Sequence, residues 1–308
     1  MDLDIVIVGG GPAGLSAALA LGRARKRTLL CDAGAPRNAA AAHIQGFITR
    51  DGTPPAEFRR LARAELTAYP SVVVRDVRVQ DIAARGPDAF AVTLADGSRV
   101  TARRVLLCTG LVDELPALPG VAEHWGTSVH LCPYCHGWEL RERPTGYLCP
   151  DPAMLEWALL LRGWTRTVVV FTDDAFPVPD ETRARLTRAG VAIEPRKLKR
   201  LVGADSLTAV ELADGARVAI EGLYVRPKQH QVGLVTALGL ALDEHGFVQV
   251  DMHKQTSHPG VYAAGDLTTG LQGAVFSAAA GYQAGAMINH ALTIELALAG
   301  QLEGRARE

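Results

Sequence analysis

A glycine-rich turn directly after a short apolar run is the feature that most constrains the fold of this chain. Residues 5–8 (IVIV) are all β-branched, residues 9–14 read GGGPAG, and an alanine- and leucine-rich segment follows to residue 21. The first segment predicts a buried strand, the second a tight turn and the third a helix. A further apolar run at residues 28–32 predicts a second strand. Strand, helix and strand in this order predict a parallel α/β domain with a right-handed crossover.

The same turn has the G-x-G-x-x-G spacing of a dinucleotide-binding loop. Glycines at these positions let the backbone approach a pyrophosphate at the N-terminus of the helix. Asp32 ends the second predicted strand, where a carboxylate can accept hydrogen bonds from a ribose diol. Because strand, helix and acid are all in register, a dinucleotide site is favoured over a turn without a ligand. Its predicted contacts are Gly9, Gly11, Pro12, Ala13, Gly14 and Asp32.

Later segments extend this first domain. Two runs around an Asp-Gly turn, residues 89–94 and 99–101, predict an antiparallel hairpin, and residues 105–108 predict another buried strand. Near the end of the chain, strands are expected around residues 247–250 and at 261–264, with a long helix after them. These segments would complete the sheet that the glycine-rich turn begins.

Between these two sets of segments the α/β pattern restarts. Short apolar runs predict strands at residues 147–148 and 167–171, with a helix at 153–162 between them. A length of 308 residues is enough for about two domains. We therefore predict an α/β fold of two Rossmann-like domains, the second inserted into the first. The first comprises residues 1–115 and 228–308, and the inserted domain comprises residues 116–227.

Charge and hydropathy exclude some classes of partner. The chain has 32 Lys and Arg against 33 Asp and Glu, so it lacks the basic excess that typifies proteins binding nucleic acid or anionic membranes. The uncharged stretch at residues 267–289 contains Ser, Thr, Gln and Gly, which favours a buried soluble helix over a membrane span. The first four residues, MDLD, include two acidic and no basic side chains, so we expect a cytoplasmic protein.

A pair of cysteines carries the second motif, CPYCHG at residues 132–137. Cys132 and Cys135 have the spacing of a redox-active disulfide, and Pro133 suits the first turn of a helix. The N–H groups at the start of such a helix would stabilise a thiolate. Together with a dinucleotide site, this pair predicts a dithiol that exchanges electrons.

Three other interpretations of this motif were weighed. C-x-x-C-H is also the attachment pattern of c-type haem, but that attachment takes place outside the cytoplasm. A structural zinc site would need a second Cys or His pair at ligand spacing, which does not follow. Simple core packing is disfavoured by the Pro, Tyr, His and Gly around the pair. Packing is instead the role we expect for Cys31, Cys108 and Cys149, which lie in or beside apolar runs.

A third motif, HPGVYAAGD at residues 258–266, resembles the flavin-binding signature of FAD-dependent pyridine nucleotide-disulphide oxidoreductases. The resemblance implies FAD at the first site, with Asp266 contacting the ribitol chain. The loop at residues 36–38 and the pair after the strand at 105–108 are similar to further parts of that family's FAD envelope. Gln272 is either another FAD contact or a helix cap. The residues implied are Arg37, Asn38, Thr109, Gly110, Gly265, Asp266 and Gln272.

Over essentially its whole length the chain resembles the low-molecular-weight thioredoxin reductases. The resemblance implies a homodimer in which Cys135 is close to the flavin and Cys132 exchanges with substrate. Members of that family usually have an Asp after the second Cys, whereas this chain has His136. The imidazole could act as acid or base there. Alternatively, His130 or His124 has that role.

The second domain departs from the reductase pattern. Where a reductase has a second glycine-rich loop for NADPH, residues 149–153 read CPDPA. The prolines remove N–H donors, the missing glycines prevent close approach, and Asp151 is negative where a pyrophosphate would lie. The next strand ends in Thr-Asp-Asp at residues 172–174, which would repel a 2′-phosphate. We expect no conventional NADPH site.

A flavin and a dithiol without a hydride donor should run in the oxidative direction. This combination, with Cys-Pro-x-Cys-His-Gly, resembles the dithiol oxidases of gliotoxin, holomycin and romidepsin type. The resemblance implies an FAD-dependent dithiol oxidase of antibiotic biosynthesis, which forms an intramolecular disulfide in a small-molecule dithiol and reduces O2 to H2O2. Two alternatives stay open: a thioredoxin-disulfide reductase-like enzyme using NADPH or another donor, and a flavin-bearing redox sensor.

Overall fold

The computed structural model describes residues 2–86 and 88–302. They form two compact units, of which the first comprises the described residues of 1–39, 53–112 and 229–308 and the second residues 40–52 and 113–228. The two connecting segments, β7 (Val112–Glu114) and β16 (Lys228–His230), pair with each other.

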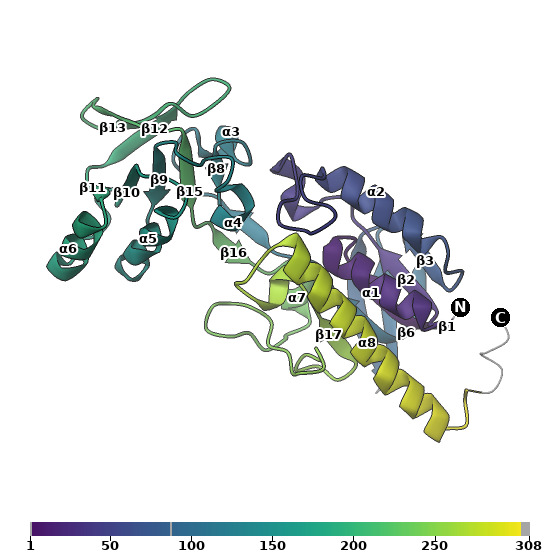
Figure 1. Cartoon of the computed structure of the whole chain (residues 1–308). Coiled ribbons are helices and arrows are strands. Elements are labelled where there is room, and N and C mark those ends of the chain that lie inside the picture. The colour runs from purple at the N-terminus through teal and green to yellow at the C-terminus, as the bar shows by residue number, and fades with distance from the viewer. Residues whose placement is uncertain (1, 87, 303–308) are drawn as a thin grey trace. The chain divides into compact units, whose positions relative to one another are not determined.

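The first unit is built on a seven-stranded sheet in the order β3-β2-β1-β6-β5-β4, with β17 paired to β6 (Figure 1). β1, β2, β3, β6 and β17 are parallel, and β4, β5 and β6 form an antiparallel extension. The strands are β1 (Asp2–Val8), β2 (Thr28–Cys31), β3 (Val72–Arg75), β4 (Val79–Gly86), β5 (Ala89–Leu94), β6 (Arg99–Leu107) and β17 (Val261–Ala263). The helices are α1 (Pro12–Arg23), η1 (Arg37–Ala40), α2 (Pro55–Leu66), α7 (Gly233–Ala237), η3 (Asp266–Thr268) and α8 (Ala274–Leu298).

Both faces of this sheet are covered, which explains why its central strands are apolar without alternation. Ile5 and Ile7 of β1 pack on one face against α1 and α8, which lie side by side in Figure 1. Val6 and Val8 point to the other face, against β17, α7 and the antiparallel strands. The helices approach closely because α8 has small residues: a Cβ placed on Gly281 would lie 1.9 Å from the carbonyl oxygen of Ala13.

The second unit contains a five-stranded parallel sheet in the order β11-β10-β9-β15-β8 and a separate three-stranded sheet, β12-β13-β14. Its strands are β8 (Val129–His130), β9 (Thr145–Leu148), β10 (Val168–Phe171), β11 (Val191–Glu194), β12 (Leu198–Val202), β13 (Ala209–Leu212), β14 (Arg217–Ala219) and β15 (Gly222–Val225). Its helices are α3 (Val121–His124), α4 (Pro133–His136), η2 (Pro152–Trp157), α5 (Ala158–Leu161) and α6 (Asp180–Arg188).

The structure confirms the predicted α/β fold class with parallel sheets, and it corrects several elements. The predicted strand at residues 247–250 is wrong, because Val248 makes only an isolated bridge to Leu242. Residues 99–101 and 105–108 belong largely to one strand, β6, rather than to two. The predicted helix at residues 153–162 is a 3₁₀ helix followed by a single α turn.

Two further observations concern segments singled out in the sequence. None of the helices in the described part of the chain is long and apolar enough to span a membrane. The segment at residues 40–52 groups with the second unit. Its Gln45 donates a hydrogen bond to Glu139 over 3.1 Å, and the turn at Gly126 fits closely on the backbone of Ala40.

Candidate functional site

The glycine-rich turn between β1 and α1 fits tightly against neighbouring backbone on one side and is open on the other. A Cβ on Gly9, whose φ is +114°, would lie 2.2 Å from the carbonyl oxygen of Cys108, and one on Gly14 would lie 1.9 Å from that of Gly9. A Cβ on Gly11 would meet no atom within 4 Å, and no side chain caps the N-terminus of α1. The turn is therefore a cradle that is open beside Gly11, which fits a dinucleotide pyrophosphate.

Asp32 follows β2 and lies against this turn, since a Cβ on Gly10 would be 2.3 Å from its Oδ2. Oδ1 of Asp32 accepts a hydrogen bond from the N–H of Gly34 over 3.0 Å, and Oδ2 is 2.7 Å from the Arg63 guanidinium. Arg63 comes from α2 and was not predicted. It fixes the orientation of the carboxylate beside the turn.

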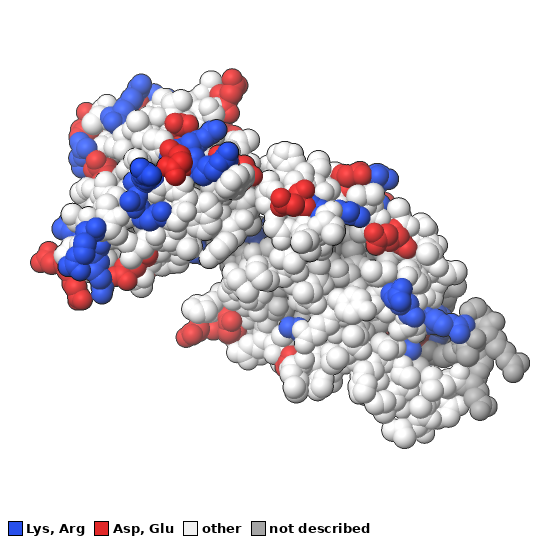
Figure 2. Space-filling view, viewed as in Figure 1, with Lys and Arg blue, Asp and Glu red and all other residues white. Residues whose placement is uncertain are grey.

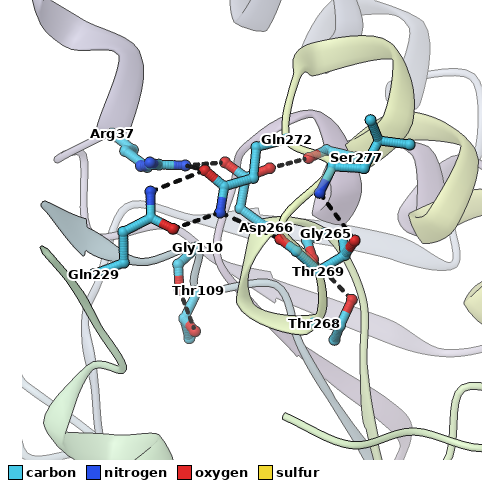
Figure 3. Close-up of polar contacts among 11 residues, drawn as sticks. Arg37, Thr109, Gly110, Gln229, Gly265, Asp266, Thr268, Thr269, Gln272 and Ser277 are labelled. Atoms are coloured by element: carbon cyan, nitrogen blue, oxygen red, sulfur yellow. Dashed lines mark hydrogen bonds and ion pairs between the residues drawn. The ribbon is translucent and has the colours of Figure 1, made fainter. Parts of the chain in front are cut away.

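The Ala-Gly-Asp segment after β17 joins the same cradle. A Cβ on Gly265, whose φ is +95°, would lie 3.0 Å from Cβ of Ala13. Asp266 begins η3, and its two oxygens accept hydrogen bonds from Arg37 over 2.7 Å and from the hydroxyl of Ser277 over 2.8 Å (Figure 3). Residues more than two hundred positions apart thus meet at one carboxylate.

Arg37 also connects this carboxylate to a pair of amides (Figure 3). Its guanidinium donates to Oε1 of Gln272 over 2.7 Å, and Gln272 and Gln229 exchange hydrogen bonds in both directions. The N-cap of α8 is Gly273 without a side-chain hydrogen bond, so Gln272 does not cap that helix. Gln229 and Ser277 carry no local sequence signal, because only the tertiary fold brings them here.

The remaining predicted contacts lie in the same unit. Thr109 and Gly110 follow β6, directly after the carbonyl on which Gly9 rests, and Gly110 has open space around its Cα. Asn38 lies beside Arg37 in η1. One set of residues lies near the N-terminus of α1, and we call it the polar rim. It consists of the turn at residues 9–14, Asp32, residues 109–110 after β6 and the Ala-Gly-Asp segment at residues 264–266.

The two cysteines of the CPYC motif lie together in the second unit. Cys132 is the N-cap of α4, and the thiol of Cys135 donates to its Sγ over 2.6 Å. That hydrogen bond, followed by the N–H groups of Cys135 and Tyr134, lowers the pKa of the Cys132 thiol to about 7 against the opposing effect of burial. α4 is a single turn, and the N–H groups at its start favour the thiolate, as the sequence predicted, together with the partner thiol.

Two histidines stack beside this dithiol. The rings of His136 and His130 are 4.0 Å apart at an interplanar angle of 14°. Burial lowers the pKa of both imidazoles, that of His130 to about 3 with a further contribution from His136, whereas Glu139 partly opposes the shift at His136. Both Nδ1 atoms are buried without a hydrogen-bond partner among the described residues. His124, the other histidine considered, lies in α3 and makes no ring contact with this described pair.

The loop after β9, where the sequence analysis expected no NADPH site, is closed by its own side chains. Oδ1 of Asp151 accepts a hydrogen bond from the N–H of Ala153 over 2.9 Å and thereby caps η2. The thiol of Cys149 donates to the carbonyl of Asp151 over 3.1 Å. A carboxylate therefore occupies the helix end at which a pyrophosphate would bind.

Known proteins resemble this chain over most of its length. The family described as pyridine nucleotide-disulphide oxidoreductase matches residues 3–285. Thioredoxin reductase tcpT of Claviceps purpurea is 34% identical over 310 residues, 96% of this chain and 95% of that protein. An Arthroderma benhamiae protein with the name "Probable thioredoxin reductase" is 38% identical over 175 residues, and that match spans only 43% of its length.

Solved structures show the same architecture. The crystal structure of HlmI matches with a TM-score of 0.91 and 40% identity, covering 99% of this chain and 97% of HlmI. An oxidoreductase from Agrobacterium tumefaciens matches with a TM-score of 0.90 and 36% identity, covering 96% of this chain and 99% of that one.

Proposed function

The chain belongs to the pyridine nucleotide-disulphide oxidoreductase family, whose thioredoxin reductase-like members are FAD-binding flavoproteins, and we propose that it is a dithiol oxidase. In this reaction a small-molecule natural-product dithiol becomes an intramolecular disulfide, and O2 becomes H2O2. The observation that carries the proposal is the contrast within the second unit. Its dithiol is intact, whereas the helix end for a nicotinamide nucleotide is capped by Asp151.

We assign the FAD contacts to the predicted residues of the first unit. Gly9, Gly11 and Gly14 with Pro12 and Ala13 would hold the pyrophosphate, and Asp32 the ribose. Asp266, with its neighbours around the polar rim, would hold the ribitol chain. Bound FAD supplies an acceptor that takes an electron pair from a dithiol and delivers it to O2.

The dithiol acts by thiol–disulfide exchange. A substrate thiolate attacks Sγ of Cys132 in the Cys132–Cys135 disulfide, which breaks that bond and releases Cys135 as a thiolate. The second substrate thiolate then attacks the substrate sulfur of the mixed disulfide, so the product disulfide forms and Cys132 leaves as a thiolate. The two substrate thiols lose two protons and two electrons in all. Neutral His136 accepts a proton from an entering thiol.

A low pKa suits Cys132 for the exchange role. Its thiolate is the leaving group of the second step, and a thiol of lower pKa leaves faster. Cys132 is also the N-cap of α4, where the N–H groups of Tyr134 and Cys135 contribute to lowering the pKa of its thiol. This position supports the assignment of Cys132 as the exchange cysteine and Cys135 as the one that serves the flavin.

We further propose that the enzyme is a cytoplasmic homodimer of antibiotic biosynthesis. Five cysteines in 308 residues are too few for a secreted disulfide framework, which suits a cytoplasmic protein. The surface along α8 carries few charges (Figure 2) and exposes Val275, Phe276 and Tyr282. An exposed apolar surface of this kind suits self-association.

The names of the relatives favour the alternative function of a thioredoxin reductase. Measuring oxygen uptake distinguishes a dithiol oxidase from a thioredoxin reductase. We expect the FAD-loaded protein to consume O2 with dithiothreitol alone and to release one H2O2 per disulfide. Cys132→Ser and Cys135→Ser should retain FAD and lose this turnover, because each removes one sulfur of the exchanging pair. Turnover that starts only when NADPH is added would establish the reductase instead.

A further inference from the structure

One face of the parallel sheet in the second unit carries a row of rings beside the dithiol. Tyr224 of β15 is paired in register with Tyr147 of β9 and with His130 of β8. Paired residues of neighbouring strands point to the same face, so the three side chains form a row across the sheet. The Tyr224 hydroxyl and His130 Nδ1 are buried and lack a hydrogen-bond partner in the described chain.

Arg226 and Cys132 lie just beyond this row. Each is two residues past a paired position, Arg226 past Tyr224 and Cys132 past His130. Both therefore follow the carboxyl ends of adjacent parallel strands, the edge at which α/β sheets place their ligands.

Trp157 holds the Arg226 side chain at this edge. The guanidinium carbon lies 4.6 Å from the centroid of the Trp157 ring, which in turn packs 4.7 Å from Tyr147 and 5.8 Å from Tyr224. Trp157 ends η2, the helix that Asp151 caps. The segment that begins with the CPDPA loop at residues 149–153 thus supplies the indole that orients this arginine.

The charge of Arg226 is not compensated by an acid. It makes no ion pair in the part of the chain that the structure describes, and its Nε is buried without a hydrogen-bond partner. Other arginines of this unit, such as Arg196 and Arg200, pair with carboxylates. A guanidinium without a paired acid acts at longer range than a paired one, because no neighbouring negative charge cancels its field.

We propose that Arg226 is a positioning residue that acts through Cys132: its uncompensated positive charge stabilises the Cys132 thiolate during exchange. The proposal rests on the assignment of Cys132 as the exchange cysteine. It also gives Trp157 a role, because the indole ring keeps the guanidinium at the edge of the sheet.

Among the groups that act on Cys132, Arg226 is the one that carries a positive charge. The Cys135 thiol and two backbone N–H groups are neutral donors, and Arg226 is the full positive charge that acts on the thiolate. Burial, together with the charges of both cysteines and Glu139, raises the pKa of Tyr224, so its phenol stays neutral. His136 is neutral at neutral pH as well, because burial lowers its pKa.

The test measures the thiol rather than turnover. Cys132 of the FAD-loaded, anaerobically reduced protein is alkylated with iodoacetamide across pH 5 to 9, and its modification is followed by mass spectrometry. For Arg226→Gln we expect the midpoint of the profile to rise by less than about one pH unit, because Arg226 is the weakest of the groups that lower this pKa, so that alkylation at low pH slows roughly two- to fivefold. Arg226→Lys, which keeps the charge, should restore most of the wild-type profile.

Two further variants make the outcome decisive. Trp157→Leu leaves the charge but removes its support, and should shift the midpoint in the same direction by less. Arg143→Gln removes an exposed arginine just before β9, at the opposite edge of the sheet, and should leave the profile unchanged. Wild-type profiles for both Arg226→Gln and Trp157→Leu would overturn the proposal, as would an equal shift in Arg143→Gln. A protein without oxidase turnover would still show these shifts, so failure of the proposed function is distinguishable.

Discussion

The two stacked histidines beside the dithiol are uncharged at neutral pH, because burial lowers the pKa of each imidazole. A neutral imidazole can accept a proton, whereas the carboxylic acid usual at this position in thioredoxin reductases is suited to donating one during reduction. The replacement therefore agrees with a reaction in which thiols enter and a disulfide leaves. His136 adjoins Cys135 in sequence, and His130 holds its ring by stacking.

His136→Ala should slow dithiol oxidation by roughly 10²-fold or more, the effect typical of removing a general base. Because the base acts when neutral, the wild-type rate should stay constant above the His136 pKa and fall as the pH drops through it. That acidic limb should lie below 6.5, the ordinary value, since burial lowers this pKa. The measurement is the pH dependence of kcat/KM, and high pH should partly rescue the variant by supplying substrate thiolate.

His245→Ala provides a matched control, because His245 is an exposed histidine of the first unit. Its rate and pH profile should equal those of the wild type. A His136→Ala enzyme with a near-normal rate and an intact acidic limb would make His136 a packing residue and would assign the proton transfer elsewhere.

At this scale the sequence singles out residues that belong to local motifs and passes over those that only the fold brings in. The glycines, Asp32 and Asp266 are predicted as contacts because turn geometry and chain order constrain them within a few positions, and their role as FAD contacts stays a prediction. Arg63 and Ser277 could not be found, because their roles depend on contacts with residues distant in sequence. Arg226 was not predicted for the same reason, since a single arginine after a strand does not form a recognisable motif.

Among the elements, α1 and α8 show how the dinucleotide turn is supported. Ala13, inside the turn, presents its carbonyl oxygen to Gly281 of α8, and Gly285 similarly faces Ala17. Small residues at this four-residue spacing let two helices approach backbone to backbone. α8 therefore packs against the start of α1 and supports the turn before it. Both ends of the chain are needed for one site for this reason.

Gly281→Ala should destabilise the first unit and weaken FAD retention. Its Cβ would lie 1.9 Å from a backbone oxygen, so the helices must separate. Overpacking of this kind costs about 1–3 kcal/mol. Urea unfolding followed by flavin fluorescence would measure both effects. Gly233→Ala is the matched control, because its Cβ meets nothing within 4 Å. Equal stability of the two variants would contradict the proposed support.

Elements were predicted well where the hydrophobic period was clear. β1, α1, β2 and α8 begin within a few residues of their expected positions. The antiparallel strand β4 was missed, because its exposed face is polar and its register depends on β5. Residues 247–250 look like a strand in isolation, but no neighbouring strand offers them a continuous ladder in the described structure.

For the whole molecule, the prediction of an interrupted first domain rests on chain order, because the flavin-type motifs lie at both ends of the sequence. Chain order did not predict that residues 40–52 group with the second unit, since that depends on contacts such as the one between Gln45 and Glu139. The absence of a conventional NADPH site stays a prediction, and the structure adds one observation to it: in the loop after β9, Asp151 accepts a hydrogen bond from the N–H of Ala153.

The direction of electron flow is the central claim, and anaerobic reduction of the bound flavin tests it most directly. Without oxygen, dithiothreitol should bleach the flavin absorbance of the wild-type protein, and readmitted O2 should restore it with formation of H2O2. NADPH and NADH at micromolar to millimolar concentrations should leave the absorbance unchanged, because Asp151 caps the helix end where their pyrophosphate would bind. Rapid, saturable bleaching by either nucleotide at low concentration would contradict the account and identify a reductase.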